Sequence, residues 1–263
     1  MEATLPPLAA ATAVPSVLLL LFAGHILGDF GLQTRWMVDG KRRPAVLGSH
    51  VMVVTSAHLL LLLPHMGLAV AAACISVGVL HAAIDAAKTW WPFRSPGSLG
   101  LFLLDQLAHG IVVLAVFWIL REWSGPFATH LSLEWLRGWQ VVAILLAALA
   151  FTANGGAAIV SGVLATLSPG LEEAEDASSG LRGSGRLIGI LERTITLVLI
   201  VLGQWAAIVL LLAAKSIARF EELKDRRFAE YYLVGTLTSI LVAILVGLAL
   251  LLLLFGAVPS RPG

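Results

Sequence analysis

The sequence predicts an all-α protein, a polytopic bundle of about six or seven transmembrane helices. Hydrophobic residues make up 59% of the 263-residue chain and charged residues only 13%, and the mean hydropathy is +0.93. These values lie far outside the range of soluble domains. The apolar residues also form unbroken runs of about 20, the length that a helix needs to cross a bilayer. Such runs differ from the alternating strands of about ten residues that build membrane barrels.

Seven apolar runs are the candidate spans. They lie near residues 15–32, 45–63, 66–87, 99–120, 139–167, 187–214 and 233–258. We expect the first run to be a retained helix, because neither a basic segment nor a small-residue cleavage site accompanies it. The fifth run contains Asn154-Gly155-Gly156, a helix-breaking signal. It is therefore either a span or a re-entrant hairpin.

The orientation follows from the lysines and arginines in the short loops, which favour the cytoplasm. Arg35 and the run from Lys41 to Arg43 follow the first span, so this loop is placed inside. If every later run crosses the membrane, the basic stretch 215–227 falls outside. A hairpin in the fifth run returns that stretch to the cytoplasm, and we adopt this interpretation. The expected location is a bacterial inner membrane, crossed several times.

The chain divides by composition into two predicted domains. Residues 1–138 form an N-terminal four-helix membrane domain, and residues 139–263 form a C-terminal membrane domain. The second domain includes an acidic flexible linker at 168–186 and a basic helical extension at 215–232. The net charge of +1 and the lack of a basic motif argue against nucleic-acid binding. The expected partners are membrane lipids, and the sequence leaves the oligomeric state open.

Three pairs of histidine and aspartate stand four positions apart within the apolar runs. They are His25 with Asp29, His81 with Asp85, and Asp105 with His109. Four positions place both side chains on one helix face, and a random scatter would give roughly 0.3 such pairs when counted against the helical template. Ionisable groups in hydrocarbon face the bundle interior and mark functional sites. The predicted orientation puts all three pairs, and also His50 of the second run, at one depth near the cytoplasmic surface.

Imidazole and carboxylate groups in one layer suit a divalent metal such as Zn, Mn or Fe. The absence of cysteine ligands argues against a closed structural zinc site. The candidate ligands are His25, Asp29, His50, His81, Asp85, Asp105 and His109, and the three aspartates are also the candidate catalytic residues. Gln33, His58 and Gln106 are candidates to orient the ligands from outside. The candidates to bind an anionic head group are Lys88, Lys215 and Arg219.

Several of these motifs also carry a family resemblance. The stretch 25–34 (HILGDFGLQT), then His50, His81 with Asp85 and Lys88, and the stretch 105–109 (DQLAH) resemble the bacterial membrane family catalogued as domain of unknown function 3307 (DUF3307). The resemblance covers about residues 15–120. Later stretches at 189–193, 214–220 and 230–237 resemble the C-terminal half of longer members. The resemblance implies an integral membrane protein, but it implies no activity, metal or substrate.

Three functions fit this pattern. The first is a metal-dependent hydrolase that acts on a lipid or lipid-linked ester or phosphoester. The alternative is a proton- or cation-coupled transporter or channel, in which the same groups relay protons or coordinate the translocated ion. The third is a membrane scaffold with a polar core and no chemistry. A closed cluster favours the enzyme, whereas a polar path that continues through His58 to the far side favours transport.

Overall fold

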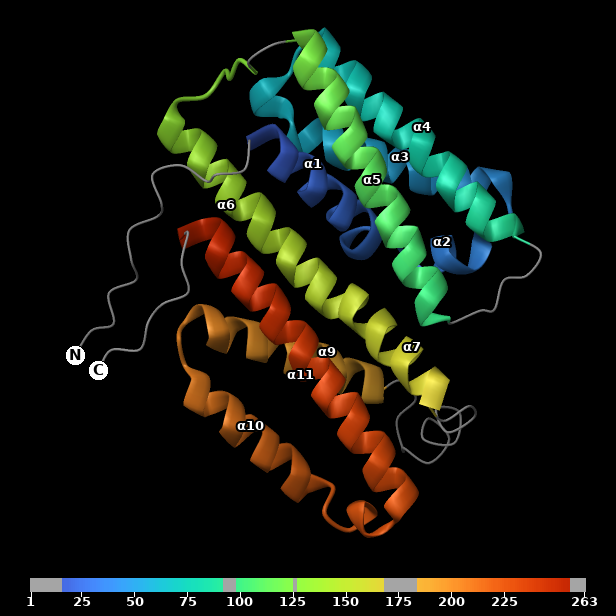
Figure 1. Ribbon diagram of the computed structural model, residues 1–263, viewed down its shortest axis with the longest axis vertical. Helices are drawn as coiled ribbons and strands as arrows, with labels where there is room; N and C mark the ends of the chain where they lie inside the picture. The colour runs from blue at the N-terminus through green and yellow to red at the C-terminus, as the bar shows by residue number, and fades with distance from the viewer. Residues whose placement is uncertain (1–15, 92–97, 125–126, 168–183, 256–263) are drawn as a thin grey trace. The chain divides into compact units, whose positions relative to one another are not determined.

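The computed structural model describes residues 16–91, 98–124, 127–167 and 184–255, and the secondary structure in these segments is entirely helical (Figure 1). The predicted all-α fold class is therefore confirmed. Packing divides the described residues into two compact units. The N-terminal unit comprises residues 16–91 and 100–151, and the C-terminal unit comprises residues 152–255 with Ser98 and Leu99. Most of the predicted acidic linker lies outside the described residues, and the domain boundary at 138 stays a prediction.

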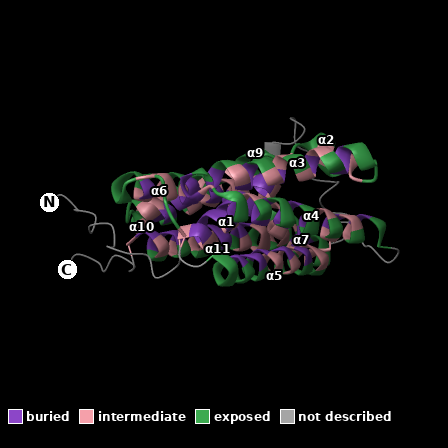
Figure 2. Ribbon diagram, turned by 90° about the horizontal axis from the view of Figure 1, so that it is seen from above, coloured by how far each residue is buried: buried purple, intermediate pink, exposed green. Residues whose placement is uncertain are grey.

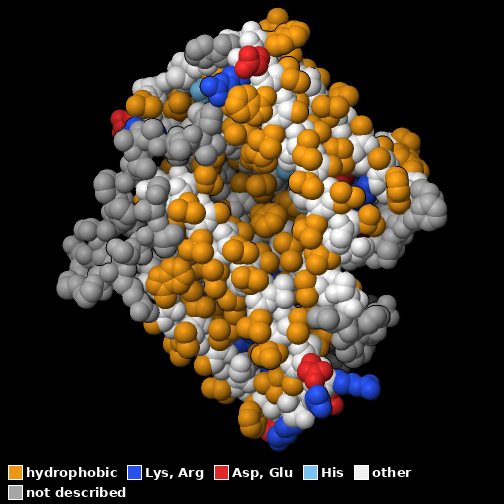
Figure 3. Space-filling view, in the orientation of Figure 1, with side chains coloured by type: hydrophobic (Ala, Val, Ile, Leu, Met, Phe, Trp, Pro, Cys, Tyr) orange, Lys and Arg blue, Asp and Glu red, His pale blue; other side chains and the backbone are white. Residues whose placement is uncertain are grey.

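Five helices in the described segments are long and apolar enough to cross a membrane. They are α3 (Pro44–Leu61), α4 (Leu68–Trp90), α5 (Leu99–Ser124), the continuous helix Leu133–Thr166, and α11 (Arg226–Phe255). Their outward side chains are large and apolar, for example Leu68 and Trp123, which are 90% and 88% exposed. Hydrophobic side chains cover most of the face seen in Figure 3. The protein is therefore a membrane protein by the composition of its surface.

The N-terminal unit is a bundle around an apolar core. Helix α1 (Ser16–Ile26) packs against α3 and α6 (Leu133–Ala150), and α3 packs against α4. The core includes Leu20, Leu21, Cys74 and Phe117, all nearly inaccessible. A short helix η2 (Leu63–His65) joins α3 to α4. Buried residues alternate with exposed ones along each helix (Figure 2), because one face packs inward and the other does not.

Helix α1 ends in a π-helix, η1 (Leu27–Gly31), whose i to i+5 pattern shows in the 2.8 Å bond from the Leu32 N–H to the Leu27 carbonyl. Here η1 lies directly against α3: a Cβ on Gly28 would lie 3.1 Å from Val54 Cα. Glycine therefore permits the close approach that brings η1 against α3. The short helix α2 (Arg35–Gly40) follows, with Thr34 as its N-cap, and packs on α3.

The predicted re-entrant hairpin at residues 139–167 is wrong. The chain continues as a helix from α6 through a second π-helix, η3 (Phe151–Gly155), into α7 (Gly156–Leu167). The carbonyls of Thr152 and Ala153 accept bonds from the Arg193 guanidinium, 2.8 Å from Nε and 3.0 Å from Nη2. A Cβ on Gly156 would lie 2.9 Å from Arg193 Cδ. Because Gly156 has no side chain, Arg193 fits against the helix and bonds to the backbone carbonyls that the π-turn leaves without a helical partner. The helix therefore continues and no turn forms.

The predicted sixth span at residues 187–214 is also wrong, because the helix is interrupted between Val201 and Trp205. Helix α9 (Ser184–Val201) ends in a turn, and α10 (Trp205–Ala218) begins after it. Gly203 adopts a φ of +69° in this turn, a conformation that glycine takes readily. Within the C-terminal unit, α9 packs against α10, α7 and α11. Helix α11 follows η4 (Glu222–Lys224) and covers the described part of the predicted seventh span.

Candidate metal centre

Seven buried histidine and aspartate side chains meet inside the N-terminal unit. Helix α1 and η1 supply two of them, α3 one, and α4 and α5 two each. The side chains are His25, Asp29, His50, His81, Asp85, Asp105 and His109, and the most exposed of them, Asp29, is 9% accessible. Six of these candidate ligands fall in groups whose ligand atoms lie close enough together to hold a metal, whereas Asp105 lies at the edge, with its Oδ1 3.7 Å from His109 Nδ1.

Asp29, His50 and His81 form the tightest group. Asp29 Oδ1 lies 3.3 Å from His50 Nε2 and 3.5 Å from His81 Nε2, and the two imidazole nitrogens are 3.1 Å apart. Metal–ligand bonds of about 2.0–2.1 Å in a tetrahedral site place neighbouring ligand atoms about 3.3–3.4 Å apart. The three atoms therefore already have the spacing of one face of a tetrahedral metal site.

Asp85 forms a second triangle with the same two histidines. Its Oδ2 lies 3.3 Å from His50 Nε2 and 3.5 Å from His81 Nε2. The same oxygen accepts a hydrogen bond of 2.5 Å from Lys41 Nζ. Lys41 follows α2 and reaches the site from the loop before α3, a contact that no helical spacing in the sequence indicated.

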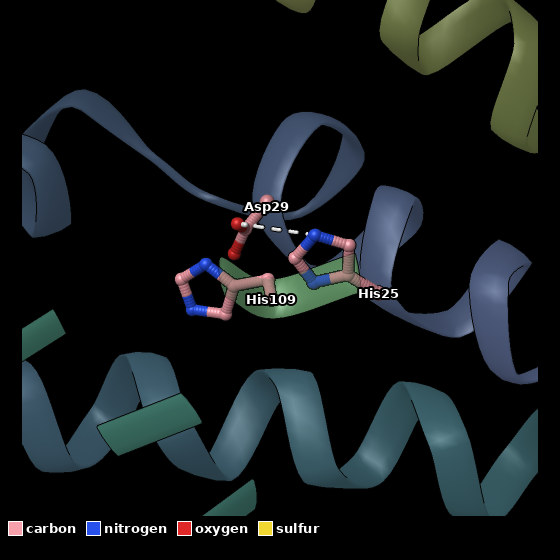
Figure 4. Close-up of side chains that lie close together, drawn as sticks. All are labelled: His25, Asp29 and His109. Atoms are coloured by element: carbon pink, nitrogen blue, oxygen red, sulfur yellow. Dashed lines mark ion pairs between the residues drawn. The ribbon is translucent and has the colours of Figure 1, made fainter. Parts of the chain in front are cut away.

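Asp29 also faces a further pair of histidines (Figure 4). Its Oδ2 lies 3.9 Å from His25 Nε2, and the rings of His25 and His109 stack with their centroids 5.0 Å apart. His109 Nδ1 donates to the carbonyl of Asp105 at 2.8 Å, so Nε2 carries the free lone pair. The two oxygens of Asp29 thus face different histidines, as in a carboxylate that bridges two cations.

The buried charges are unevenly compensated. Lys41 pairs with Asp85, and Lys88 Nζ lies 2.6 Å from Asp105 Oδ2. In the described part of the chain, no lysine or arginine pairs with Asp29, whose Oδ1 has no hydrogen-bond partner. A buried carboxylate without a counter-charge is costly. The donor set and this orphaned oxygen therefore fit a bound dication.

Two glutamines connect the centre to its surroundings. With its amide oriented to suit its neighbours, Gln33 accepts from His50 Nε2 at 3.1 Å and from Lys41 Nζ at 2.9 Å. Gln106 lies 3.3 Å from His25 Nε2 and donates to Asp105 Oδ2 at 3.2 Å. Both contacts use Nε2, the ring nitrogen that also faces Asp29, and not the opposite nitrogen through which an outer group orients a metal ligand. The role of the glutamines in orienting ligands therefore stays a prediction.

The other predicted site residues lie apart from these triangles. His58 donates through Nδ1 to the carbonyl of Val54, and its Nε2 has no hydrogen-bond partner. In the C-terminal unit, Lys215 pairs with Glu192 at 2.7 Å and Arg219 with Glu222 at 3.5 Å. Like Lys88, both predicted head-group residues of this unit are thus already paired with carboxylates.

Fold and site together define a helical membrane protein with a buried centre of histidines and aspartates. Comparison with known families matches residues 17–134 to the family described as "Protein of unknown function (DUF3307)". This match supports the resemblance that the motifs indicated, and the matched residues contain all seven residues of the centre. Searches of curated proteins and of solved structures found no match.

Proposed function

We propose that the N-terminal unit is a metal-dependent hydrolase that acts on an ester or phosphoester of a lipid or lipid-linked substrate. One observation carries the proposal. The ligand atoms of Asp29, His50 and His81 have the spacing of a metal site, and in the described part of the chain the Asp29 carboxylate has no lysine or arginine as an ion-pair partner. Zn, Mn or Fe bound there would acidify a water molecule or polarise a phosphoryl or carbonyl oxygen.

The remaining residues have roles that follow from their contacts. Lys41 and Lys88 pair with Asp85 and Asp105 and so offset two of the three buried carboxylates. The Nε2 lone pair of His109 has no partner, so it can accept a proton from the attacking water. Gln33 and Gln106 contact the Nε2 atoms of His50 and His25, so a metal bound there would displace these two contacts.

The core of the N-terminal unit favours an enzyme over a transporter. Beyond His58, the apolar side chains come from α1, from the C-cap of α3 and from α5, among them Leu21, Leu62 and Phe117. These three are at most 1% exposed. Among the described residues, the polar cluster therefore does not continue as a path along these helices. A closed polar centre with an apolar layer beside it suits chemistry at one membrane surface.

We further propose that the centre opens to the cytoplasm. With Leu133–Thr166 crossing the membrane, the α9–α10 pair returns to the side from which it entered. Eleven of the 14 described lysines and arginines then lie on one side, Arg121 and Arg137 on the other, and Arg193 within the protein. This distribution agrees with the positive-inside rule. With Cys74 replaced by Ala, an impermeant maleimide should label Ser132→Cys in intact cells but not Ser216→Cys, and the reverse labelling would contradict the orientation.

Elemental analysis of the purified full chain tests the metal site. We expect one or two equivalents of metal in the wild type and a loss of at least one in Asp29→Asn. Asp39→Asn is the matched control, because Asp39 lies exposed in α2 outside the centre, and it should keep its metal. Hydrolysis is then measured as phosphate release from phosphatidic acid vesicles by wild type and Asp29→Asn. A folded wild type that takes up no metal would contradict the proposal.

A further inference from the structure

A groove lies on the outer surface of the N-terminal unit, next to the candidate metal centre. Its volume is about 530 Å³, within the usual range of ligand sites. One face of α3 forms most of it, and residues that follow η1 complete it. The lining residues are Leu32, Met37, Ser49, Met52, Val53, Ser56, Ala57 and Leu60. From Ser49 to Leu60 the groove follows α3 for about 16 Å, at 1.5 Å per residue.

The groove and the centre share a wall. Leu32 lines the groove, and the next residue, Gln33, bonds to His50 and Lys41. Ser49 lines the groove, whereas its neighbour His50 is fully buried in the centre. A molecule in the groove is thus separated from the candidate ligands only by the backbone segments that carry Gln33 and His50.

Free positive charge lies in the segment that leads into α3. Arg35, Arg42 and Arg43 are exposed, and in the described part of the chain no carboxylate forms an ion pair with them. In contrast, Lys41 is already paired with Asp85. An apolar groove with unpaired arginines near one end complements a lipid that has an apolar chain and an anionic head.

We propose that the groove binds one acyl chain of an anionic phospholipid, with the phosphate at Arg35, Arg42 and Arg43. The acyl chain of the lipid lies along α3 over Met52, Val53 and Leu60, and the ester linkages of its head group lie beside Gln33. That this lipid is also the substrate rests on the proposed function. Binding itself depends only on the groove and the arginines.

Photolabelling in vesicles tests the groove. The full chain is reconstituted in phosphatidylcholine containing a small share of phosphatidic acid with a diazirine on its acyl chain, and labelled peptides are mapped by mass spectrometry. We expect labelling to concentrate on the groove face of α3, and a phosphatidylcholine probe with the same chain to lack this preference. Neutralising Arg42 and Arg43 should reduce the labelling about fivefold for each residue removed.

A bulky side chain in the groove supplies the matched comparison. Ser56→Trp fills the groove and should abolish the preference for α3. Ser76→Trp places the same side chain at an exposed serine of α4 outside the groove and should leave it unchanged. Equal labelling of α3 and α4 in the wild type, or full labelling of Ser56→Trp, would overturn the inference.

The experiments distinguish a failure of the lipid groove from a failure of the proposed hydrolase. Labelling that persists in Asp29→Asn, together with a wild type that hydrolyses no phosphatidic acid, would retain the lipid groove and contradict the hydrolase. Metal binding that persists while the groove shows no preference for the anionic probe would contradict only the groove.

Discussion

Replacing Lys41 by Met tests the charge balance of the centre directly. Lys41 is the cation of a largely buried ion pair, with side-chain exposures of 18% for Lys41 and 2% for Asp85. Removing one partner of a buried pair leaves an uncompensated charge and destabilises a protein by about 3–5 kcal/mol. Because Lys41 is partly exposed, we expect the metal-free variant to lose about 3 kcal/mol of unfolding free energy.

The same change should strengthen metal binding. The three aspartates and the two lysines of the centre leave one net negative charge, and Lys41→Met leaves two. Lys41 Nζ bonds to the same Asp85 oxygen that faces His50 Nε2, so its charge would repel a cation held there. Affinity for Zn should therefore rise at least about tenfold, since 1.4 kcal/mol corresponds to a factor of ten.

Both quantities can be measured on detergent-solubilised protein, stability by denaturant unfolding with a chelator present and affinity by competition with a zinc indicator. Lys88→Met is the comparison, because the Lys88 side chain is twice as exposed as that of Lys41, 36% against 18%, so we expect it to lose less unfolding free energy than Lys41→Met. A Lys41→Met protein with the stability of the wild type and weaker zinc binding would refute the reasoning.

Three further predictions follow from individual contacts. Asp29→Asn should no longer be stabilised by Zn, yet in chelator it should melt no lower than the wild type, because the change removes an uncompensated buried charge. Calorimetry measures both melting temperatures, and a lower melting temperature of the metal-free variant would instead favour the scaffold function. Gly78→Ala should cost about 1–3 kcal/mol, since the new methyl group meets Thr55 Oγ1. Adding Thr55→Ala should restore denaturant stability, whereas Gly48→Ala, with open space around it, should raise stability by up to about 1 kcal/mol. Arg193→Lys cannot reach both η3 carbonyls and should lower unfolding free energy by about 1–3 kcal/mol, and unchanged unfolding would show that the guanidinium is dispensable.

The sequence predicted the centre because local spacing and depth agree. His25 with Asp29 and His81 with Asp85 are pairs within one helix, so the 3.6-residue period alone places each pair on one face. His50 has no aspartate partner on its own helix, and it was predicted because it lies at the same membrane depth as the pairs. Lys41 could not be found in this way, because its contact with Asp85 spans 44 residues of sequence and depends on how α2 packs.

The sequence did not reveal which glycine interrupts a helix. Gly155-Gly156 is the stronger breaker by composition, but the side chain of Arg193 bonds to the neighbouring carbonyls and the helix continues. Gly203, between Leu202 and Gln204, takes a positive φ and ends α9. The polar Gln204 directly after Gly203 was a signal for this turn. The outcome at each glycine depends on a tertiary contact or on its absence, which local sequence does not record.

The π-helix η1 gives Asp29 a position that a regular helix would not give it. A π-turn accommodates one residue more than an α-turn does, so a deletion at 27 or 28 would close it into a regular turn and leave the helix on either side facing as before. Asp29 lies inside η1. The deletion would make it the third residue after His25 instead of the fourth, a change of about 100° around the helix. When homologues are aligned, a one-residue gap just before this aspartate would therefore indicate a chain in which its contacts with His50 and His81 are lost.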